Sequence, residues 1–204
     1  MDNLLQVILL GIIEGVTEFL PVSSTGHLLI AEHWLGARSD LFNIAIQAGA
    51  ILAVVLIYRR RLWSLTIGFF EPDNRDYALK LALAFLLTCV GGLTAKKLGL
   101  ELPEDITPVA WALVVGGLVI VAIEALVAGK PEQTRITWTV AIAVGLAQVL
   151  AAVFPGTSRS AATIFAAMLA GTTSRAAAAE FAFLLGIPTM FAATALEILK
   201  AVKA

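Results

Sequence analysis

Charged residues are scarce in this sequence, and their scarcity excludes an ordinary soluble domain. Only 14% of the 204 residues are Asp, Glu, Lys or Arg, whereas 59% are hydrophobic, and the mean hydropathy is +0.91. A soluble domain carries about a quarter charged residues. The run at 109–128, VAWALVVGGLVIVAIEALVA, is long enough to cross a hydrocarbon core, which takes about 20 mostly apolar residues. The composition therefore predicts an integral membrane protein.

The sequence also has no excess of basic charge and only one cysteine, and each of these features removes a class of function. The formal net charge is −1 and the isoelectric point is 6.1, so the chain lacks the broad basic surface with which proteins bind nucleic acid. We therefore expect no nucleic-acid partner. The single cysteine, Cys89, lies in the apolar run LALAFLLTCVGG, which excludes a disulfide framework or a cysteine metal site within one chain. Its surroundings are typical of a packing residue rather than a reactive thiol.

Apolar runs interrupted by proline and polar residues predict an all-α, polytopic membrane protein. The runs lie at about 4–20, 25–35, 41–58, 78–95, 109–128, 137–154, 160–171 and 180–200. Two neighbouring pairs, 4–20 with 25–35 and 137–154 with 160–171, are broken at a proline, and the second member of each pair is too short to span a bilayer. Such broken segments predict two re-entrant helical hairpins, which are tolerated at membrane depth where they line a cavity or are buried in protein.

Basic residues indicate which ends of the spans face the cytoplasm. The cluster RRR at 59–61 follows the run that ends at residue 58, so the positive-inside rule places this end in the cytoplasm. Lys130 and Arg135 fall on the same side two spans later, whereas Lys96 falls outside. We expect the segment EPDNRDY at 71–77 to be a polar cytoplasmic loop.

An internal repeat relates the two predicted hairpins. A shift of 134 positions lays GIIEGVTEFLPVSSTG at 11–26 on GLAQVLAAVFPGTSRS at 145–160. Paired positions include Gly11 with Gly145, Glu14 with Gln148, Pro21 with Pro155, and Ser24 with Ser158. Three full spans are expected between the hairpins, and because this number is odd, the second copy would enter the membrane from the opposite face. Inverted topology of this kind places a polar site near the midplane, where the repeats meet.

The repeat also sets the expected domain organisation. Residues 1–204 are expected to form a single membrane domain, with the first repeat at 1–128 and the second at 137–204. A full second copy would need about two further spans beyond residue 204. The second repeat is therefore expected to be truncated.

Two glutamates share one face of the first broken run. Glu14 and Glu18 are four residues apart, which places both carboxylates on the same side of a helix. An ionisable side chain at the centre of a membrane helix costs about 2.5–3.5 kcal/mol on insertion scales, so such residues are functional candidates. A divalent cation or a cationic partner would remove their mutual repulsion, and carboxylates suit Mg²⁺ or Ca²⁺. The alternative is a pair near the interface that is merely solvated.

Hydroxyl groups and one imidazole follow at the chain break PVSSTGH, at 21–27. Ser23, Ser24 and Thr25 supply hydroxyls, and a helix that begins at residue 25 would point its free amides at an anion. His27 titrates near neutrality and can act as an acid or a base. The alternative is that the hydroxyls only cap the helix and that His27 only packs.

The second hairpin contributes the segment PGTSRSAAT at 155–163. Arg159 lies here at expected membrane depth, and a guanidinium is well shaped to bind two phosphate oxygens at once. Ser158, Ser160 and Thr163 add hydroxyl donors. The alternative is that Arg159 extends to the lipid headgroups. Two carboxylates, a group of hydroxyls, one imidazole and one arginine at the meeting point of two repeats fit phosphate chemistry best.

The motifs GIIEGVTEFLPVSSTGH and FPGTSRSAAT resemble the two signature regions of the undecaprenyl-diphosphate phosphatase family, the BacA-type enzymes of bacterial cell-wall synthesis. The resemblance extends from about Leu4 to Lys200. It implies a hydrolase of the bacterial inner membrane that converts undecaprenyl diphosphate to undecaprenyl phosphate and inorganic phosphate. Such enzymes recycle the lipid carrier for peptidoglycan and confer bacitracin resistance. The resemblance also implies a divalent-metal requirement and a site open to the periplasmic side.

Roles for particular residues follow from the same resemblance. The acidic motif of the family falls on Glu14 and Glu18, which would act in catalysis and bind the metal. The serine and histidine of the family fall on Ser24, as the nucleophile or a phosphate ligand, and on His27, as a proton relay. The phosphate-binding arginine of the family falls on Arg159.

Two departures from the family pattern and two rival functions accompany this prediction. Ala161 stands where the family usually has Gly, and family members continue for about two more helices beyond residue 204. Their absence would leave an apolar flank open to lipid or to a second copy in a homodimer. A flippase or transporter for polyprenyl phosphate would also use an inverted repeat, but anion transport has no need of two carboxylates beside an anionic headgroup. The second rival is a non-catalytic, truncated paralogue that binds lipid or acts as an immunity factor.

Overall fold

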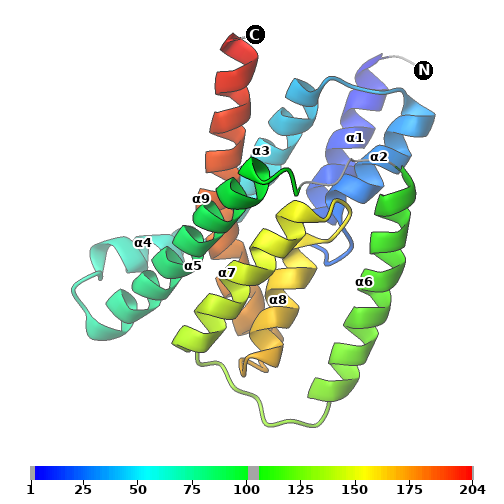
Figure 1. Cartoon of the computed structure of the whole chain (residues 1–204). Coiled ribbons are helices and arrows are strands. Elements are labelled where there is room, and N and C mark those ends of the chain that lie inside the picture. The colour runs from blue at the N-terminus through cyan, green and yellow to red at the C-terminus, as the bar shows by residue number, and fades with distance from the viewer. Residues whose placement is uncertain (1–2, 101–105, 204) are drawn as a thin grey trace.

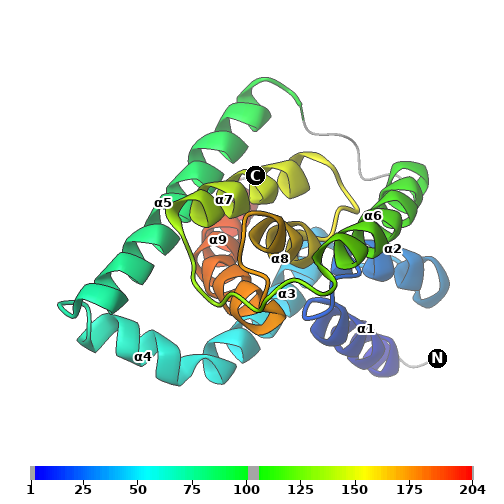
Figure 2. The same cartoon turned by 90° about the horizontal axis from the view of Figure 1, so that it is seen from below.

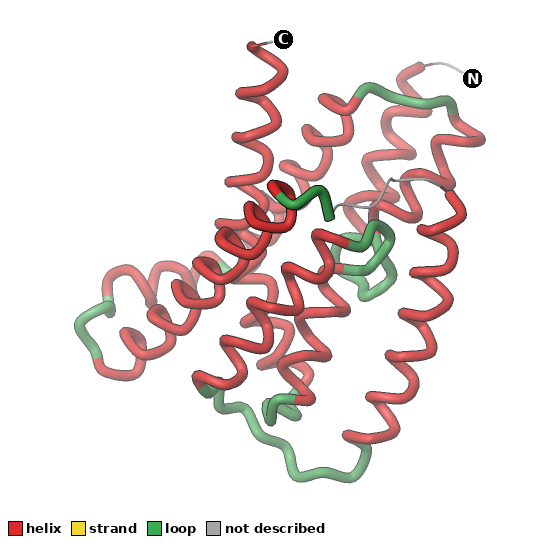
Figure 3. The backbone as a smooth tube through the Cα atoms, in the orientation of Figure 1, coloured by secondary structure: helices red, strands yellow, loops and turns green. Residues whose placement is uncertain are grey.

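The described part of the chain is built from helices, as the sequence predicts. The computed structural model describes residues 3–100 and 106–203, and within them there are nine helices and no strand. They follow one another as α1 (Asn3–Thr17), α2 (Ser24–Leu35), α3 (Asp40–Ile57), α4 (Arg59–Ile67), α5 (Pro72–Lys97), α6 (Ile106–Val127), α7 (Trp138–Val153), α8 (Arg159–Leu169) and α9 (Arg175–Lys203). Figures 1 and 3 show their arrangement.

Several helices are long and apolar enough to cross a membrane. Three meet this condition alone, namely Pro72–Lys97, Ile106–Val127 and Arg175–Leu196, and α3 with α4 forms a fourth span if the bent pair is one segment. Many large apolar side chains on these helices are exposed, including Leu118 and Val121 on α6. A soluble protein rarely exposes apolar surface of this extent. The chain is therefore a multi-pass membrane protein.

The structure adds a helix that the sequence does not predict after the third apolar run. The sequence predicts that a span ends at residue 58 and that the basic cluster at 59–61 lies beyond it. In the structure, the chain bends by 67° at this point and continues as α4. The three arginines begin the new helix, because arginine is a good helix former and because the apolar residues that follow continue a helical pattern.

The prediction of a loop at 71–77 is wrong, because α5 already begins at Pro72. Proline is favoured in the first turn of a helix, where its missing N–H has no partner in any case. Asp73 also lies in this first turn, where a negative charge is stabilised by the helix dipole. The polar residues of this segment therefore start a helix instead of breaking one.

The two helical hairpins enter the molecule from opposite ends. In Figure 1, α1 and α2 open at the top, α7 and α8 open at the bottom, and both turns lie between these ends. The turns touch, since the Ser160 hydroxyl donates a hydrogen bond to the Leu20 carbonyl at 3.0 Å. Helices α1, α7 and α8 are apolar but have only 10–17 residues, as re-entrant segments require. The inverted repeat of 1–128 and 137–204 remains a prediction.

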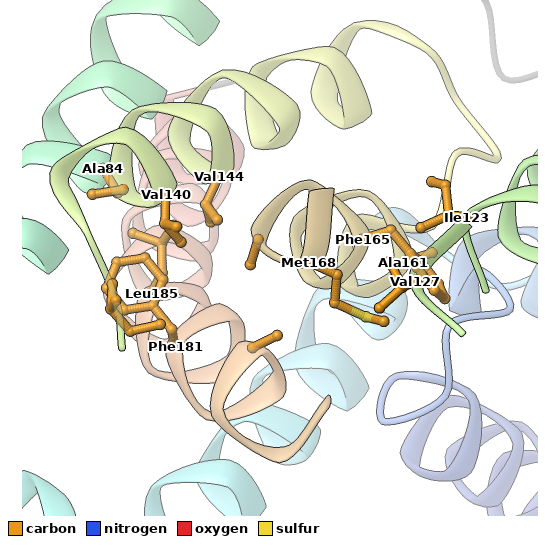
Figure 4. Close-up of a cluster of buried hydrophobic side chains, with 14 residues drawn as sticks. Ala84, Ile123, Val127, Val140, Val144, Ala161, Phe165, Met168, Phe181 and Leu185 are labelled. Carbon is orange, nitrogen blue, oxygen red and sulfur yellow. The ribbon is translucent and has the colours of Figure 1, made fainter. Parts of the chain in front are cut away.

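The hydrophobic core fixes α8 between its neighbours. Helix α8 contacts α6, α7 and α9, and these helices surround it in the view from below (Figure 2). Figure 4 shows one group of core side chains from α5, α7 and α9 and a second group from α6 and α8. The close approach of α7 to α5 depends on Gly145, where an added Cβ would lie 2.9 Å from the Ala84 carbonyl oxygen. The core thereby holds the first residue of α8, Arg159, in place.

Candidate active site

A cavity of about 590 Å³ lies at the meeting point of the two turns. Seven of the ten residues predicted from the sequence line it: Glu18, Ser23, Ser24, Thr25, Ser158, Arg159 and Ser160. Figure 3 shows the two turns side by side in green, and the contact between Ser160 and Leu20 joins them. Residues separated by about 140 positions in the sequence thus form one polar cavity inside an otherwise apolar bundle.

The first turn is organised by two neighbouring serines. Ser23 caps α2, since its hydroxyl accepts a hydrogen bond from the Gly26 N–H at 3.3 Å. Its backbone has φ of 65°, a left-handed conformation that non-glycine residues adopt mainly where the surroundings enforce it. Ser24 is left free of the cap, and its hydroxyl donates to a carboxylate oxygen of Glu18 at 2.5 Å. Both serines are buried, so the turn presents a preorganised hydroxyl beside a carboxylate.

The second turn brings its own serine cap and a close backbone contact. The Ser158 hydroxyl accepts from the Ala161 N–H at 3.2 Å and lies 3.1 Å from the Ser160 hydroxyl. Gly156 has φ of 82°, and an added Cβ would lie 2.8 Å from the Cα of Val109. Only glycine fits this conformation and this contact with α6 without strain. The turn is therefore held against α6, with the first residues of α8 facing the cavity.

An ion pair between Arg159 and Glu18 joins the two hairpins across the cavity. The Arg159 side chain is only partly exposed and that of Glu18 is nearly buried. Of the two sequence interpretations of Arg159, the structure therefore favours the one in which it acts inside the protein over extension to the lipid headgroups. Arg159 is also the cationic partner that reduces the repulsion between Glu14 and Glu18.

Glu14 is more deeply buried than Glu18. Its side chain is 0% exposed, and among the described residues neither carboxylate oxygen accepts a hydrogen bond. A buried, unpaired carboxylate is costly, so this position fits a bound cation. Glu18 is already engaged by Ser24 and Arg159. Within residues 3–100 and 106–203, no three His, Cys, Asp or Glu side chains form a metal-binding group, so further ligands of a cation would be hydroxyl, amide or substrate oxygens.

Three predicted residues are not among those that line the cavity: Glu14, His27 and Thr163. The Nδ1 atom of His27 lies 2.8 Å from the Ser23 carbonyl oxygen, which directs that nitrogen toward the backbone. The Thr163 hydroxyl donates to the Arg159 carbonyl at 2.8 Å within α8. Thr163 therefore supports the start of α8, and its contact with phosphate stays a prediction, as does the proton relay by His27.

Other polar residues of the cavity are absent from the sequence prediction. They are Thr17, Gln47, Thr88, Lys96, Gln148, Thr157 and Thr189. Gln47, Thr88 and Thr189 are single polar residues in apolar runs, where no local motif marks them. Gln148 did carry a signal, because the repeat aligns it with Glu14. Like Glu14, it is buried, and neither polar atom of its amide has a hydrogen-bond partner in the described parts of the chain.

A second polar cavity, of about 690 Å³, lies where α4, α5 and α9 begin. Arg61 from α4 and Arg135 from the segment before α7 both line it. Arg61 pairs with Glu180 at 3.1 Å, and the Tyr77 hydroxyl donates to the same carboxylate. The two basic segments that the sequence assigns to one side of the membrane thus meet at one end of the molecule. The opposite end of α5 carries Lys96, which lines the first cavity.

Comparison with known proteins gives a consistent result over nearly the whole chain. Residues 7–204 match the family described as bacitracin resistance protein BacA. The undecaprenyl-diphosphatase of Rhizobium etli strain CFN 42 is 63% identical over 195 residues, which cover 96% of this chain and 74% of the relative. The undecaprenyl-diphosphatase of Xylella fastidiosa strain 9a5c is 60% identical over 203 residues, which cover 100% of this chain and 78% of the relative. The undecaprenyl-diphosphatase of Xanthomonas oryzae pv. oryzae strain PXO99A is 61% identical over 203 residues, which cover 100% of this chain and 77% of the relative.

Proposed function

Because this chain belongs to the bacitracin resistance protein BacA family, we propose that it hydrolyses undecaprenyl diphosphate to undecaprenyl phosphate and inorganic phosphate. The observation that carries the proposal is the cavity between the two turns, where Arg159, Glu18 and several hydroxyls converge. A water molecule supplies the oxygen that ends on the released phosphate, and the bond between the terminal phosphorus and the bridging oxygen breaks. The lipid leaves as the monophosphate.

Arg159 is the main group for binding the headgroup. Its guanidinium donates to the Glu18 carboxylate, and a phosphate presents the same kind of acceptor oxygens to the same fork of N–H donors. Ser158 and Ser160 line the cavity beside it. These donors stabilise the negative charge that spreads over the phosphoryl oxygens in the transition state.

Ser24 and Glu18 are the pair best placed to activate a nucleophile. The hydroxyl of Ser24 is 2.5 Å from a carboxylate oxygen of Glu18, so the carboxylate can accept its proton while the hydroxyl oxygen attacks phosphorus. In that case a phosphoserine forms, and water hydrolyses it in a second step. If water attacks directly, Ser24 instead orients the phosphate, and Ser24→Ala will retain measurable turnover.

We propose that the enzyme requires Mg²⁺ or Ca²⁺. The buried carboxylate of Glu14 has no hydrogen-bond partner in the described ranges of the chain. With Glu18 one turn away, it fits a hard divalent cation. Such an ion would neutralise charge on the diphosphate. Binding at Glu14 would also explain why a carboxylate without a hydrogen-bond partner is held among apolar helices.

The cavity is proposed to open to the periplasmic side of the bacterial inner membrane. Arg61 and Arg135 line the polar cavity at the start of α5, and basic residues favour the cytoplasmic side. Lys96 at the other end of α5 lines the candidate active site. In a Cys89→Ala background, an impermeant thiol reagent should label Lys96→Cys in intact cells and Arg60→Cys only after permeabilisation. Labelling of both from outside contradicts the orientation.

Phosphate release by purified protein in detergent tests the proposed activity. We expect release from undecaprenyl diphosphate that a divalent-metal chelator abolishes and that added Mg²⁺ or Ca²⁺ restores. Transport of labelled lipid between leaflets without phosphate release would instead identify a flippase. Binding without either activity would identify a non-catalytic member of the family.

A further inference from the structure

The amide of Gln148 is the unexplained polar group of the candidate active site. It lies on α7, its side chain is 2% exposed, and neither Oε1 nor Nε2 has a hydrogen-bond partner among the residues that the structure describes. Burying an amide without such partners costs free energy. Native structures therefore rarely retain such a group unless a ligand or water satisfies it.

The position of Gln148 on its helix directs it into the cavity. Gln148, Ala151 and Ala152 all line the cavity, and residues three and four apart share one face of a helix. The two alanines leave open space beside the amide. One turn earlier, Gly145 packs against α5, where an added Cβ would lie 2.9 Å from the Ala84 carbonyl oxygen. Helix α7 is therefore fixed against α5 one turn before the amide.

We propose that the Gln148 amide nitrogen donates a hydrogen bond to a phosphate oxygen of the lipid diphosphate. This inference rests on the proposed function. A phosphate is favoured over a cation as the ligand because the nearby groups of the same hairpin, Arg159 and Ser158, are donors. Glu14, which the repeat aligns with Gln148, already offers a cation two carboxylate oxygens that accept no hydrogen bond from any residue the structure describes. A neutral amide adds a donor for the headgroup without another charge that would need a partner.

Two substitutions of similar size separate this role from a packing role. Gln148→Leu removes hydrogen bonding, and Gln148→Glu replaces the donor with a charged acceptor. Gln6→Leu is the matched control, because Gln6 lies on α1 and does not line the cavity. Its Oε1 atom accepts a hydrogen bond from the Arg38 guanidinium at 2.6 Å. The measurements are phosphate release over a range of lipid concentrations, equilibrium binding of inorganic pyrophosphate, and the melting temperature in detergent.

For Gln148→Leu we expect a loss of at least about tenfold in kcat/KM and weaker pyrophosphate binding, because a hydrogen-bond donor is removed. We expect a melting temperature equal to or above that of the wild type, because the substitution removes a buried amide that has no partner among the described residues. Gln148→Glu should lose more activity than the leucine variant, because its carboxylate repels phosphate. Gln6→Leu should keep the wild-type kcat/KM.

Other outcomes overturn the inference. Wild-type kcat/KM in Gln148→Leu means that the amide does not touch the headgroup. A lowered melting temperature that accounts for the lost activity means that Gln148 only supports the fold. Activity of Gln148→Glu at or above that of the wild type means that the residue binds a cation. If the wild type itself releases no phosphate, the proposed function fails, and pyrophosphate binding by wild type and Gln148→Leu still decides the role of Gln148.

Discussion

The two hairpins that build the candidate active site share one plan and differ in their charge. Each is broken at a proline, each carries a serine that caps its second helix, and a shift of 134 positions relates their sequences. The α1–α2 hairpin supplies the carboxylates of Glu14 and Glu18. The α7–α8 hairpin supplies the amide of Gln148 and the guanidinium of Arg159. The ion pair across the cavity shows that neither hairpin forms the site alone, because each holds the charge that the other must neutralise.

The position of the capping serine differs by one residue between the two turns, and this difference decides which serine hydroxyl is available to a neighbouring side chain. Ser24 and Ser158 are aligned by the repeat, yet the capping residue of α2 is Ser23, whereas that of α8 is Ser158. The left-handed residue is likewise Ser23 in the first turn and Gly156 in the second. Ser24 is therefore free to donate to Glu18, while its sequence equivalent is engaged at the start of α8. Aligned positions in this repeat do not have the same chemistry.

Neutralising the acidic hairpin should have the largest effect. Glu14→Gln and Glu18→Gln should each lower turnover by at least about two decades, because the cation and Arg159 lose their carboxylate partners. Glu18→Gln should also lower the melting temperature, since it removes a charge-assisted hydrogen bond worth about 1.5–3 kcal/mol. Glu14→Gln should not, because its carboxylate accepts no such bond within residues 3–100 and 106–203. Phosphate release and thermal unfolding in detergent measure both effects, and wild-type turnover in either variant would refute the assigned roles.

The basic hairpin should be nearly as sensitive. Arg159→Lys should lose about one to two decades of turnover, because lysine cannot reproduce the planar fork that binds two oxygens at once. Arg159→Ala should be only slightly worse. The comparison is made at saturating lipid, so that weaker binding is not mistaken for slower chemistry. If lysine retains near wild-type turnover, Arg159 supplies only diffuse positive charge, and the bidentate contact is wrong.

The hairpins and the helices between them also show how much of the structure can be predicted from the sequence. Hydrophobic runs predict most helices, because crossing a bilayer demands long apolar segments. They miss α4, which begins with three arginines after a 67° bend, and they misassign residues 72–77, where proline and acidic residues begin a helix. The repeat and the two motifs predict that Glu18 and Arg159 approach each other.

What the sequence does not reveal is the pairing of individual side chains. A buried arginine has several candidate anions, and only the packing of α8 against α6, α7 and α9 selects Glu18. The same holds for His27, whose Nδ1 atom lies beside a backbone carbonyl and not in the cavity. Gln47 and Thr88 enter the cavity from α3 and α5, and a single polar residue in an apolar helix carries no motif that would identify it.

A smaller effect is expected from the helix that packs behind Arg159. A Cβ added at Gly186 on α9 would collide with the Nη1 atom of Arg159, so alanine should push the guanidinium away from Glu18. We expect Gly186→Ala to lower turnover about tenfold, which corresponds to roughly 1.4 kcal/mol. Folding should be preserved, because a flexible side chain can move aside and alanine is the better helix former by about 1 kcal/mol.

Gly117→Ala is the control for this variant, since Gly117 lies on α6 with nothing within 4 Å of an added Cβ. It should leave turnover unchanged. In an Arg159→Lys background, Gly186→Ala should cost little more, because the atom it displaces is gone. An equal loss in both backgrounds would show that Gly186 does not act through Arg159.

The smallest effect is expected from the contact that joins the two turns. The Ser160 hydroxyl donates to the Leu20 carbonyl at 3.0 Å, and a neutral hydrogen bond of this kind contributes about 0.5–1.5 kcal/mol. Ser160→Ala should therefore lower turnover by less than about tenfold. Thr94→Ala is the control, because Thr94 is exposed and donates only to the Val90 carbonyl within α5. A loss as large as that of Arg159→Ala would show that Ser160 touches the reacting phosphate, and the second hairpin would then supply a catalytic hydroxyl as well as its positive charge.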